Sequence, residues 1–347
     1  MMDFSKYLKL WYLQNKRDLP WRQTKDPFKI WLSEIILQQT RVDQGLAYFL
    51  RFINAYANVE HLANADEEEV LKLWQGLGYY SRARNLHFSA QYIMEHFNGK
   101  FPSTYNEIIQ LKGVGDYTAS AIASICFNEP TAVVDGNVYR VLARYFGIKT
   151  AINSTKGIKE FKALAQEVLL EEDPGTFNQA IMEYGARLCV PQNPNCESCG
   201  LKNSCYAYLK GEVKSLPYKE KKIKIKKRYF NYLVIHTKND STELEKRTKG
   251  IWTGLYQFPL IETSKEINYQ ELMEHSEFLS RFQQMDTHTK EYTTSEKPHK
   301  LSHQHIFSKF WFVEVAKYPH ANIYWKEVFD FPVPILIDNF LQEYYSR

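Results

Sequence analysis

The chain has 347 residues, of which 44% are apolar, and its 44 Lys and Arg against 40 Asp and Glu leave a formal charge of +4. This length allows about two domains with cores of their own, and no apolar run approaches the roughly 18 residues of a membrane span. We expect no signal peptide, because Asp3, Lys6 and Lys9 interrupt the N-terminal segment.

Residues 1–205 show the spacing of amphipathic helices almost throughout. Apolar side chains recur at helical intervals in several stretches, such as Phe4, Leu8, Trp11 and Tyr12. Asp26-Pro27 predicts an N-cap followed by proline at the first helical position. Thr104 and Glu107 have the spacing of a capping box. We therefore predict an all-α first domain.

A glutamate interrupts an apolar stripe in the helix expected over residues 28–41. Glu34 lies between Ile30 and Leu37 on one face of that helix. One interpretation is a buried ion pair with an arginine. The other is a functional carboxyl whose pKa is raised by burial, so that it holds a proton near neutral pH.

A glycine-rich hairpin lies between two expected helices and reads LKGVGDYTA over residues 111–119. Its two glycines allow a tight turn and a close approach of the backbone to a ligand. The free N–H groups of the following helix favour an anion. The pattern predicts a helix-hairpin-helix that grips one DNA phosphate with Gly113, Val114 and Gly115 without reading sequence. An ordinary turn between helices is the alternative.

Asp135 follows twenty residues after Gly115, directly before an amphipathic helix with Val138 and Leu142 on its apolar face. An N-cap is its simplest role. From that position a carboxylate can also point into a cleft.

Four cysteines occur within seventeen residues, with the spacing C-x6-C-x2-C-x5-C: Cys189, Cys196, Cys199 and Cys205. Four thiolates in a short loop suit a 4Fe–4S cluster. A structural zinc would accept them too, although zinc ribbons usually show two C-x2-C pairs. Unligated thiols are a third interpretation, which Pro191 and Pro194 disfavour because they make this stretch a loop. The lack of an even-numbered disulfide framework indicates a reducing, cytoplasmic environment.

Residues 206–228 form a predicted basic linker, with nine basic and two acidic residues over 210–228. Such a run is commonly a solvated linker, although it could also follow a phosphate backbone. Beyond it the hydrophobic period changes to two, notably over 228–236 and 310–315, which predicts strands. Residues 229–347 are thus expected to form a second, α+β domain.

The hairpin, the segment VVDGNVYRVLAR and the cysteine spacing together resemble the endonuclease III superfamily of base-excision DNA glycosylases. The resemblance covers residues 5–205 and implies that the four cysteines bind a 4Fe–4S cluster. Endonuclease III-type enzymes have a lysine two residues after the second hairpin glycine, which forms a Schiff base with the sugar. This chain has Tyr117 there, and a phenol cannot form an imine. Lys112 lies on the other side of the hairpin, so a lyase mechanism is disfavoured.

Four further segments are similar to the MutY-type adenine DNA glycosylases, which remove adenine mispaired with 8-oxoguanine: LPWR at 19–22, SEIILQQTRV at 33–42, GLGYYSRAR at 76–84 and GIWTGLYQFP at 250–259. This similarity implies a multi-domain chain. An all-α helix-hairpin-helix glycosylase with a 4Fe–4S loop would precede an α+β, Nudix-like domain that recognises the oxidised guanine.

The resemblance also implies a mechanism, in which the target base is flipped out of the duplex before chemistry. Glu34 would protonate N7 of adenine. Ionised Asp135 would stabilise the oxocarbenium-like sugar, as in retaining glycosidases, and water would complete the hydrolysis. Tyr117 and Asn137 would orient the carboxylates and the sugar.

The same resemblance implies two sets of binding residues. The adenine pocket would be lined by Trp21, Arg22 and Glu183. Gln39 and Tyr79 would wedge into the duplex. A half-buried core aromatic is the alternative for Tyr79, and a surface pair with Arg187 is the alternative for Glu183.

The family recognises oxidised guanine with a short Phe-Ser-His loop, usually preceded by a histidine. His305-Ile-Phe-Ser-Lys309 fits that frame, with lysine in place of the last histidine. Phe307 would wedge beside the lesion and Ser308 would bond its edge; a core position at a strand start is the alternative for Phe307. Leu301-Ser302-His303 is a second register, which keeps the histidine and loses the aromatic.

Nudix pyrophosphate hydrolysis is not expected, because the only candidate helix carries Glu271, Glu274 and Glu277 without the required arginine–glutamate pair. We expect a monomeric, bacterial-type, nucleoid-associated enzyme that binds double-stranded DNA with an A:8-oxoguanine or A:G mispair. An endonuclease III-like glycosylase/lyase, or a thymine-mismatch relative, is one alternative. The other is a non-catalytic iron–sulfur DNA sensor, against which the two carboxylates argue.

Overall fold

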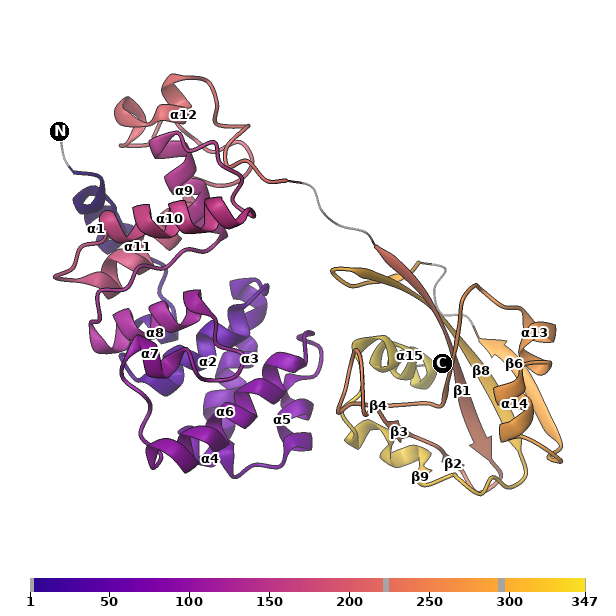
Figure 1. The fold of residues 1–347 in the computed structure, drawn as a ribbon. Coiled ribbons are helices and arrows are strands. Elements are labelled where there is room, and N and C mark those ends of the chain that lie inside the picture. The colour runs from indigo at the N-terminus through magenta and orange to yellow at the C-terminus, as the bar shows by residue number, and fades with distance from the viewer. Residues whose placement is uncertain (1–2, 221–224, 293–296, 347) are drawn as a thin grey trace. The chain divides into compact units, whose positions relative to one another are not determined.

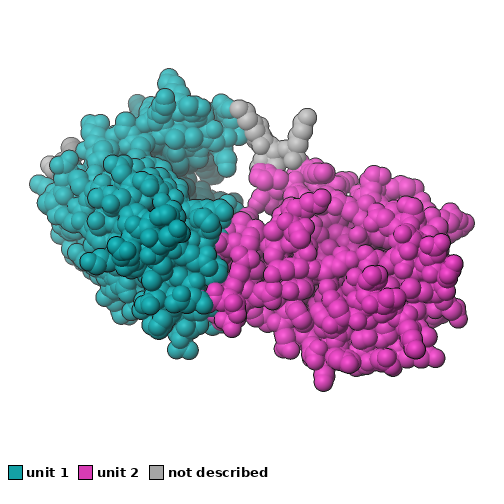
Figure 2. Space-filling view, turned by 60° about the horizontal axis from the view of Figure 1, so that its bottom comes forward, with its two compact units in different colours: residues 1–64, 85–221 teal, residues 65–84, 222–347 magenta. Residues whose placement is uncertain are grey.

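The computed structural model describes residues 3–220, 225–292 and 297–346. The chain divides into two compact units, coloured separately in Figure 2: unit 1 comprises residues 1–64 and 85–221, and unit 2 comprises 65–84 and 222–347. The domain boundaries expected at residues 205 and 229 remain predictions. Residues 221–224 of the expected linker lie outside the described part of the chain. Within that part, no helix has the length and apolarity needed to cross a bilayer.

The helical character predicted for residues 1–205 is confirmed (Figure 1). The helices and 3-10 turns up to Leu209 are α1 (Phe4–Asn15), η1 (Pro20–Arg22), α2 (Pro27–Leu37), α3 (Val42–Ala55), α4 (Val59–Ala63), α5 (Glu67–Trp74), α6 (Ser81–Phe97), α7 (Tyr105–Ile108), α8 (Asp116–Phe127), α9 (Gly136–Phe146), α10 (Thr155–Glu167), α11 (Pro174–Arg187), η2 (Lys202–Ser204) and α12 (Tyr206–Leu209). Of these, α5 and the first turn of α6 belong to unit 2.

Local sequence signals start these helices where predicted. The Asp26 carboxylate caps α2 by accepting a hydrogen bond from Phe28 N at 3.0 Å, and proline occupies the first turn. Thr104 and Glu107 form the expected capping box at α7, in which each side chain accepts from the other residue's backbone N–H.

A mixed sheet forms the centre of unit 2, with strand order β5-β1-β8-β6 and β7 also paired to β8. β1 runs parallel to β8, whereas β1–β5, β6–β8 and β7–β8 are antiparallel. The strands are β1 (Lys226–Thr237), β5 (Leu260–Thr263), β6 (Thr287–Tyr292), β7 (His299–Lys300) and β8 (Gln304–Val315). Two small antiparallel pairs join β2 (Ser241–Thr242) to β9 (Ile323–Tyr324) and β3 (Glu245–Lys246) to β4 (Tyr256–Gln257). The strands predicted at 228–236 and 310–315 lie within β1 and β8.

Alternate residues of the two long strands face two separate cores. On one face, Phe310 of β8 stacks on Phe340 of α15 (Ile335–Tyr345), with ring centroids 4.0 Å apart. On the other face, Leu233 and Trp311 pack with the residues of α13 (Tyr269–Met273) and α14 (Ser276–Arg281). A further 3-10 turn, η3 (Trp325–Asp330), precedes α15.

The expectation of one helix carrying Glu271, Glu274 and Glu277 is wrong, because that stretch forms two short helices. Glu271 closes a capping box with Asn268, and His275 caps α14. A carboxylate cluster along one helix face is therefore not formed there.

Candidate active site

Three helices that are distant in sequence bring Glu34, Tyr117 and Asp135 together in unit 1. Glu34 lies on α2, Tyr117 in the first turn of α8, and Asp135 directly before α9. The Tyr117 hydroxyl donates to Met182 Sδ at 3.2 Å, and it lies close enough to Glu34 that each of the two groups shifts the pKa of the other. The charge of Asp135 acts on both side chains. Each of the three keeps some exposed surface. The two predicted carboxylates thus belong to one site.

Burial raises the pKa of Glu34 to about 7. The nearby Tyr117 hydroxyl and, more weakly, the charge of Arg22 oppose this shift, whereas the charge of Asp135 adds to it. Glu34 can therefore exchange a proton at neutral pH, as the functional interpretation of its apolar surroundings requires. Burial also raises the pKa of the Tyr117 phenol well above its ordinary value, so this side chain acts as a hydrogen-bond donor.

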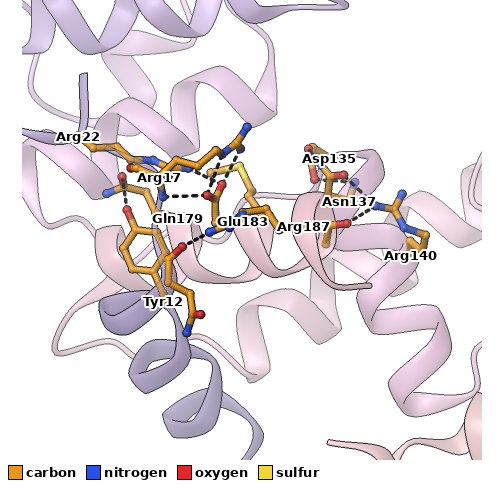
Figure 3. Close-up of polar contacts among 12 residues, drawn as sticks. Tyr12, Arg17, Arg22, Asp135, Asn137, Arg140, Gln179, Glu183 and Arg187 are labelled. Carbon is orange, nitrogen blue, oxygen red and sulfur yellow. Dashed lines mark hydrogen bonds and ion pairs between the residues drawn. The ribbon is translucent and has the colours of Figure 1, made fainter. Parts of the chain in front are cut away.

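Asp135 is the N-cap of α9, as predicted. Its carboxylate accepts hydrogen bonds from Asn137 N and Val138 N, both at 2.8 Å, and from Asn137 Nδ2 at 2.7 Å. Asn137 in turn accepts a bond from Arg140 Nη2 at 2.9 Å (Figure 3). Burial raises the pKa of Asp135, while these donors and the Arg140 charge stabilise its ionised form.

A second polar cluster surrounds Glu183, which lies on α11 with only 1% of its surface exposed. Its carboxylate accepts bonds from Arg17 Nε at 2.8 Å, Arg17 Nη2 at 2.6 Å and Arg22 Nη2 at 2.7 Å (Figure 3). Although burial opposes it, these bonds hold the pKa of Glu183 well below its usual value. The alternative of a surface pair with Arg187 is wrong, because Arg187 instead donates to the Asn15 carbonyl.

Arg17 was not identified from the sequence. A buried glutamate needs a cationic partner, but no nearby residue pattern indicates which arginine pairs with Glu183. Trp21, expected in the adenine pocket, is 7% exposed and packs edge-on against Phe49 with centroids 5.1 Å apart. This packing anchors η1, and with it Arg22.

The glycine-rich hairpin joins α7 to α8 as predicted. Gly113 adopts φ +84°, and a Cβ at this position would come within 2.8 Å of Asn85 Cβ. Gly115 is the N-cap of α8 without a side-chain cap, and nothing lies within 4 Å of a Cβ placed there. Backbone N–H groups at this helix start therefore remain available to an anion.

The two residues expected to wedge into DNA both have unusual backbone conformations. Gln39 is exposed directly after the C-cap of α2 and has φ +56°, and Tyr79 has φ +49° with 48% of its surface exposed. Non-glycine residues adopt this region rarely and at a cost, which is commonly found at functional positions. The interpretation of Tyr79 as a half-buried core aromatic is wrong.

The expectation of a short loop over residues 305–309 is wrong, because these residues lie inside β8 and pair with β1. Phe307 stacks on Tyr229 with centroids 5.1 Å apart, and Lys309 pairs with Glu266 and Glu291. The turn lies earlier, where Leu301 N donates to Gln304 O at 2.8 Å.

Residues 301–303, the second register considered, make up that turn between β7 and β8. The Ser302 hydroxyl lies 2.6 Å from the Tyr79 hydroxyl, within unit 2. The turn therefore presents a serine beside the aromatic side chain that was expected to enter DNA.

The four clustered cysteines are half-buried and form no disulfide. Burial raises the pKa of Cys196, and negative charge on the other three cysteines adds to that shift. Arg144 Nη1 lies 3.4 Å from Cys189 Sγ, and the Tyr184 hydroxyl lies 2.9 Å from Cys199 Sγ. Over the described ranges, no three His, Cys, Asp or Glu side chains converge closely enough to hold a metal ion. The loop thus supplies four neighbouring sulfur donors rather than a closed coordination shell.

Known proteins similar to this chain share both its helical half and part of its second half. Residues 32–167 match the profile of the HhH-GPD superfamily of base excision DNA repair proteins. The adenine DNA glycosylase of Buchnera aphidicola subsp. Baizongia pistaciae is 36% identical over 300 residues, which cover 86% of this chain and 82% of that protein. The adenine DNA glycosylase of Homo sapiens is 43% identical over 215 residues, covering 59% of this chain and 39% of that protein.

Solved structures resemble the helical part. A thermostable thymine-DNA glycosylase superposes with a TM-score of 0.56 at 30% identity, covering 60% of this chain and 95% of that one. Endonuclease III in a non-covalent DNA complex gives a TM-score of 0.52 at 21% identity over 60% of this chain and 94% of that one, which shows the fold alone.

Proposed function

The chain belongs to the adenine DNA glycosylases of the HhH-GPD superfamily, and we propose that it excises adenine paired with 8-oxoguanine or guanine from double-stranded DNA. Adenine removal in base excision repair is the activity of its relatives. The preference for 8-oxoguanine or guanine opposite the adenine, and action as a monomer, are part of our proposal. The 36% sequence identity with an adenine DNA glycosylase, over 86% of this chain and 82% of that protein, favours adenine as the substrate.

The observation that carries this proposal is the pair of carboxyl groups around Tyr117. With a pKa of about 7, Glu34 is close to half protonated at neutral pH and can give a proton to N7 of a flipped adenine. Departure of the base leaves a cationic sugar. Asp135, held by three N–H donors, stabilises that cation before water attacks.

Hydrolysis without strand cleavage follows from Tyr117, which occupies the position where lyases carry their lysine. Lys112, the other candidate amine, is exposed, and its Nζ lies 4.5 Å from the centroid of the Phe88 ring. Because Lys112 lies on the far side of the hairpin from Tyr117, it does not take the place of the lyase lysine. This supports a glycosylase without lyase activity.

We further propose that unit 2 carries a Nudix-like lesion reader and that its reading turn is Leu301-Ser302-His303. A turn can present side chains to a base, whereas Phe307 and Ser308 lie inside a strand, paired with Tyr229 and Phe230 of β1. The contact of Ser302 with Tyr79 supports this assignment, because the wedge and the lesion contact must act on adjacent nucleotides.

A 4Fe–4S cluster held by Cys189, Cys196, Cys199 and Cys205 fits the donor set of this loop. Four thiolates from one short segment match the ligand preference of the cluster, and Arg144 beside Cys189 offsets their negative charge. With four cysteine ligands the cluster would have no open position for substrate, so its contribution would be to hold the loop. Anaerobically purified protein should contain about four iron atoms per chain and absorb visible light, whereas Cys199→Ser should lose both.

The test of the proposed activity is single-turnover base release from duplexes with adenine opposite 8-oxoguanine, guanine, cytosine or thymine. We expect fast release opposite 8-oxoguanine and guanine, and no covalent capture with borohydride. Glu34→Gln should bind the same duplex with unchanged affinity and release adenine at least about 10³-fold more slowly. Efficient borohydride capture, or release of thymine instead of adenine, would contradict the proposal.

A further inference from the structure

Arg22 is held in the buried polar cluster around Glu183, and its charge opposes the larger effect of burial on the pKa of Glu34. How firmly this guanidinium is held therefore matters to the reaction. Three groups hold it: Glu183 Oε2 at 2.7 Å, the Arg17 carbonyl at 3.2 Å, and the Tyr12 ring, whose centroid lies 5.5 Å from Arg22 Cζ.

In the sequence, Tyr12 is marked only as an apolar position of the first helix. Its side chain is 3% exposed, so its ring presents a desolvated face to the guanidinium. Its hydroxyl donates to Gln179 Oε1 at 3.0 Å (Figure 3). Gln179 lies one turn before Glu183 on α11, so one tyrosine contacts both the arginine and the helix that carries its counterion.

We propose that Tyr12 is a positioning residue for adenine excision, which fixes the Arg22 guanidinium through its buried ring. This inference rests on the proposed function. It assigns a role in the reaction to a side chain that touches neither DNA nor a reacting atom.

The groups that act on Glu34 come from several elements, and only one of them is held by Tyr12. Arg22 is contributed by η1, Tyr117 by α8 and Asp135 by the start of α9. The Cys126 thiol of α8 is also within reach of the Glu34 charge. A change at Tyr12 should therefore alter the Arg22 contribution and leave the others in place.

The sign of the expected effect follows from that charge. Adenine release requires protonated Glu34, so the rate falls as the pH rises through its pKa. If Arg22 moves away, the pKa of Glu34 rises and the alkaline limb of the pH–rate profile shifts to higher pH. A loss of folding alone would lower the active fraction at every pH and leave the limb where it is.

The experiment compares Tyr12→Leu with Tyr12→Phe in the full-length protein, using single-turnover adenine release normalised to active enzyme. Tyr12→Leu should slow release about 10- to 100-fold, as expected for a misplaced pocket group, and shift the limb to higher pH. Tyr12→Phe keeps the aromatic face and should keep the wild-type limb. Tyr56→Leu, which truncates a buried tyrosine packed on Phe52, is the matched control and should also keep it.

A second readout does not depend on activity. The Nη–H groups of Arg22, which donate to Arg17 O and Glu183 Oε2 and are assigned by comparison with Arg22→Lys, should give slowly exchanging ¹⁵N signals in the wild type and in Tyr12→Phe, and rapidly exchanging ones in Tyr12→Leu. An unshifted limb and a retained signal in Tyr12→Leu would overturn the role of Tyr12. Failure of the wild type to release adenine would overturn the proposed function alone, since the ¹⁵N signal still reports on the contact.

Discussion

At the scale of single residues, Glu34 contributes an unfavourable term to the free energy of folding that depends on pH. Its pKa lies near 4.5 in the unfolded chain and is raised to about 7 in the folded one, chiefly by burial. Between these values the unfolded chain releases a proton that the folded chain retains. Stability is therefore lost as the pH rises from about 4.5 to about 7, and it is constant above that range.

We predict that Glu34→Gln stabilises the protein at pH 8 and has little effect at pH 4.5, because glutamine is neutral at both values. The gain at pH 8 is at most about 3–4 kcal/mol, from 1.36 kcal/mol for each unit of pKa difference. Denaturant titration of both proteins at the two pH values measures it. Glu172→Gln, at an exposed position, should show no such difference. Equal stability changes for Glu34→Gln at both pH values would mean that the carboxyl is not desolvated.

At the scale of elements, short connections present the groups that are proposed to meet DNA. The α7–α8 hairpin depends on Gly113, which combines a left-handed backbone with a close neighbour. The β7–β8 turn depends on three residues held between two antiparallel strands. In both cases the flanking elements fix the geometry and the connection supplies the contact.

Gly113→Ala should destabilise unit 1 by about 1–3 kcal/mol and weaken duplex binding, because the new methyl would lie 2.8 Å from Asn85 Cβ at φ +84°. Gly211→Ala is the matched control, since it has φ +70° with nothing within 4 Å and tests backbone strain alone. Denaturant unfolding and duplex affinity at one fixed salt concentration measure both effects. The hairpin assignment would be in doubt if the two variants behaved alike.

Ser302→Ala should reduce the preference for A:8-oxoguanine over A:G by about tenfold, the equivalent of one lost hydrogen bond of about 1.4 kcal/mol. Ser308→Ala should leave that preference unchanged, because Ser308 lies within β8. The ratio of single-turnover rates for the two duplexes provides the measurement. The opposite result, with loss only in Ser308→Ala, would restore the first register.

At the scale of the whole molecule, the features that could be predicted from the sequence are those set by neighbouring residues in the chain. The caps at Asp26 and Asp135, the hairpin and the two long strands follow from signals within a few residues of each element. The partnership of Arg17 with Glu183 joins residues far apart in the chain, and no local signal reports it. The family motif predicts a loop at residues 305–309, whereas in the structure β8 begins at Gln304 and includes them.

The grouping of residues 65–84 with unit 2 was likewise not predictable, because their apolar stripe resembles that of any other helix. In the structure, this segment is tied to the C-terminal part of the chain by several side chains, in the pairs Glu68–Tyr256, Lys72–Phe331, Gln75–Asp338 and Tyr80–Val333. Tyr79 therefore belongs to the same compact unit as the turn at residues 301–303.

This grouping predicts that α5 loses its structure together with unit 2. Phe310→Ala removes a ring stacked 4.0 Å from Phe340 and should destabilise that unit by about 3–5 kcal/mol. Amide hydrogen exchange followed by mass spectrometry should then show faster exchange in β1, β8 and α5, with α8 and α9 unchanged. Phe161→Ala, which removes a fully buried ring packed on Tyr139 in unit 1, should give the reverse pattern. Retained protection of α5 in Phe310→Ala would assign this helix to unit 1, and Tyr79 would then be positioned independently of the proposed lesion reader.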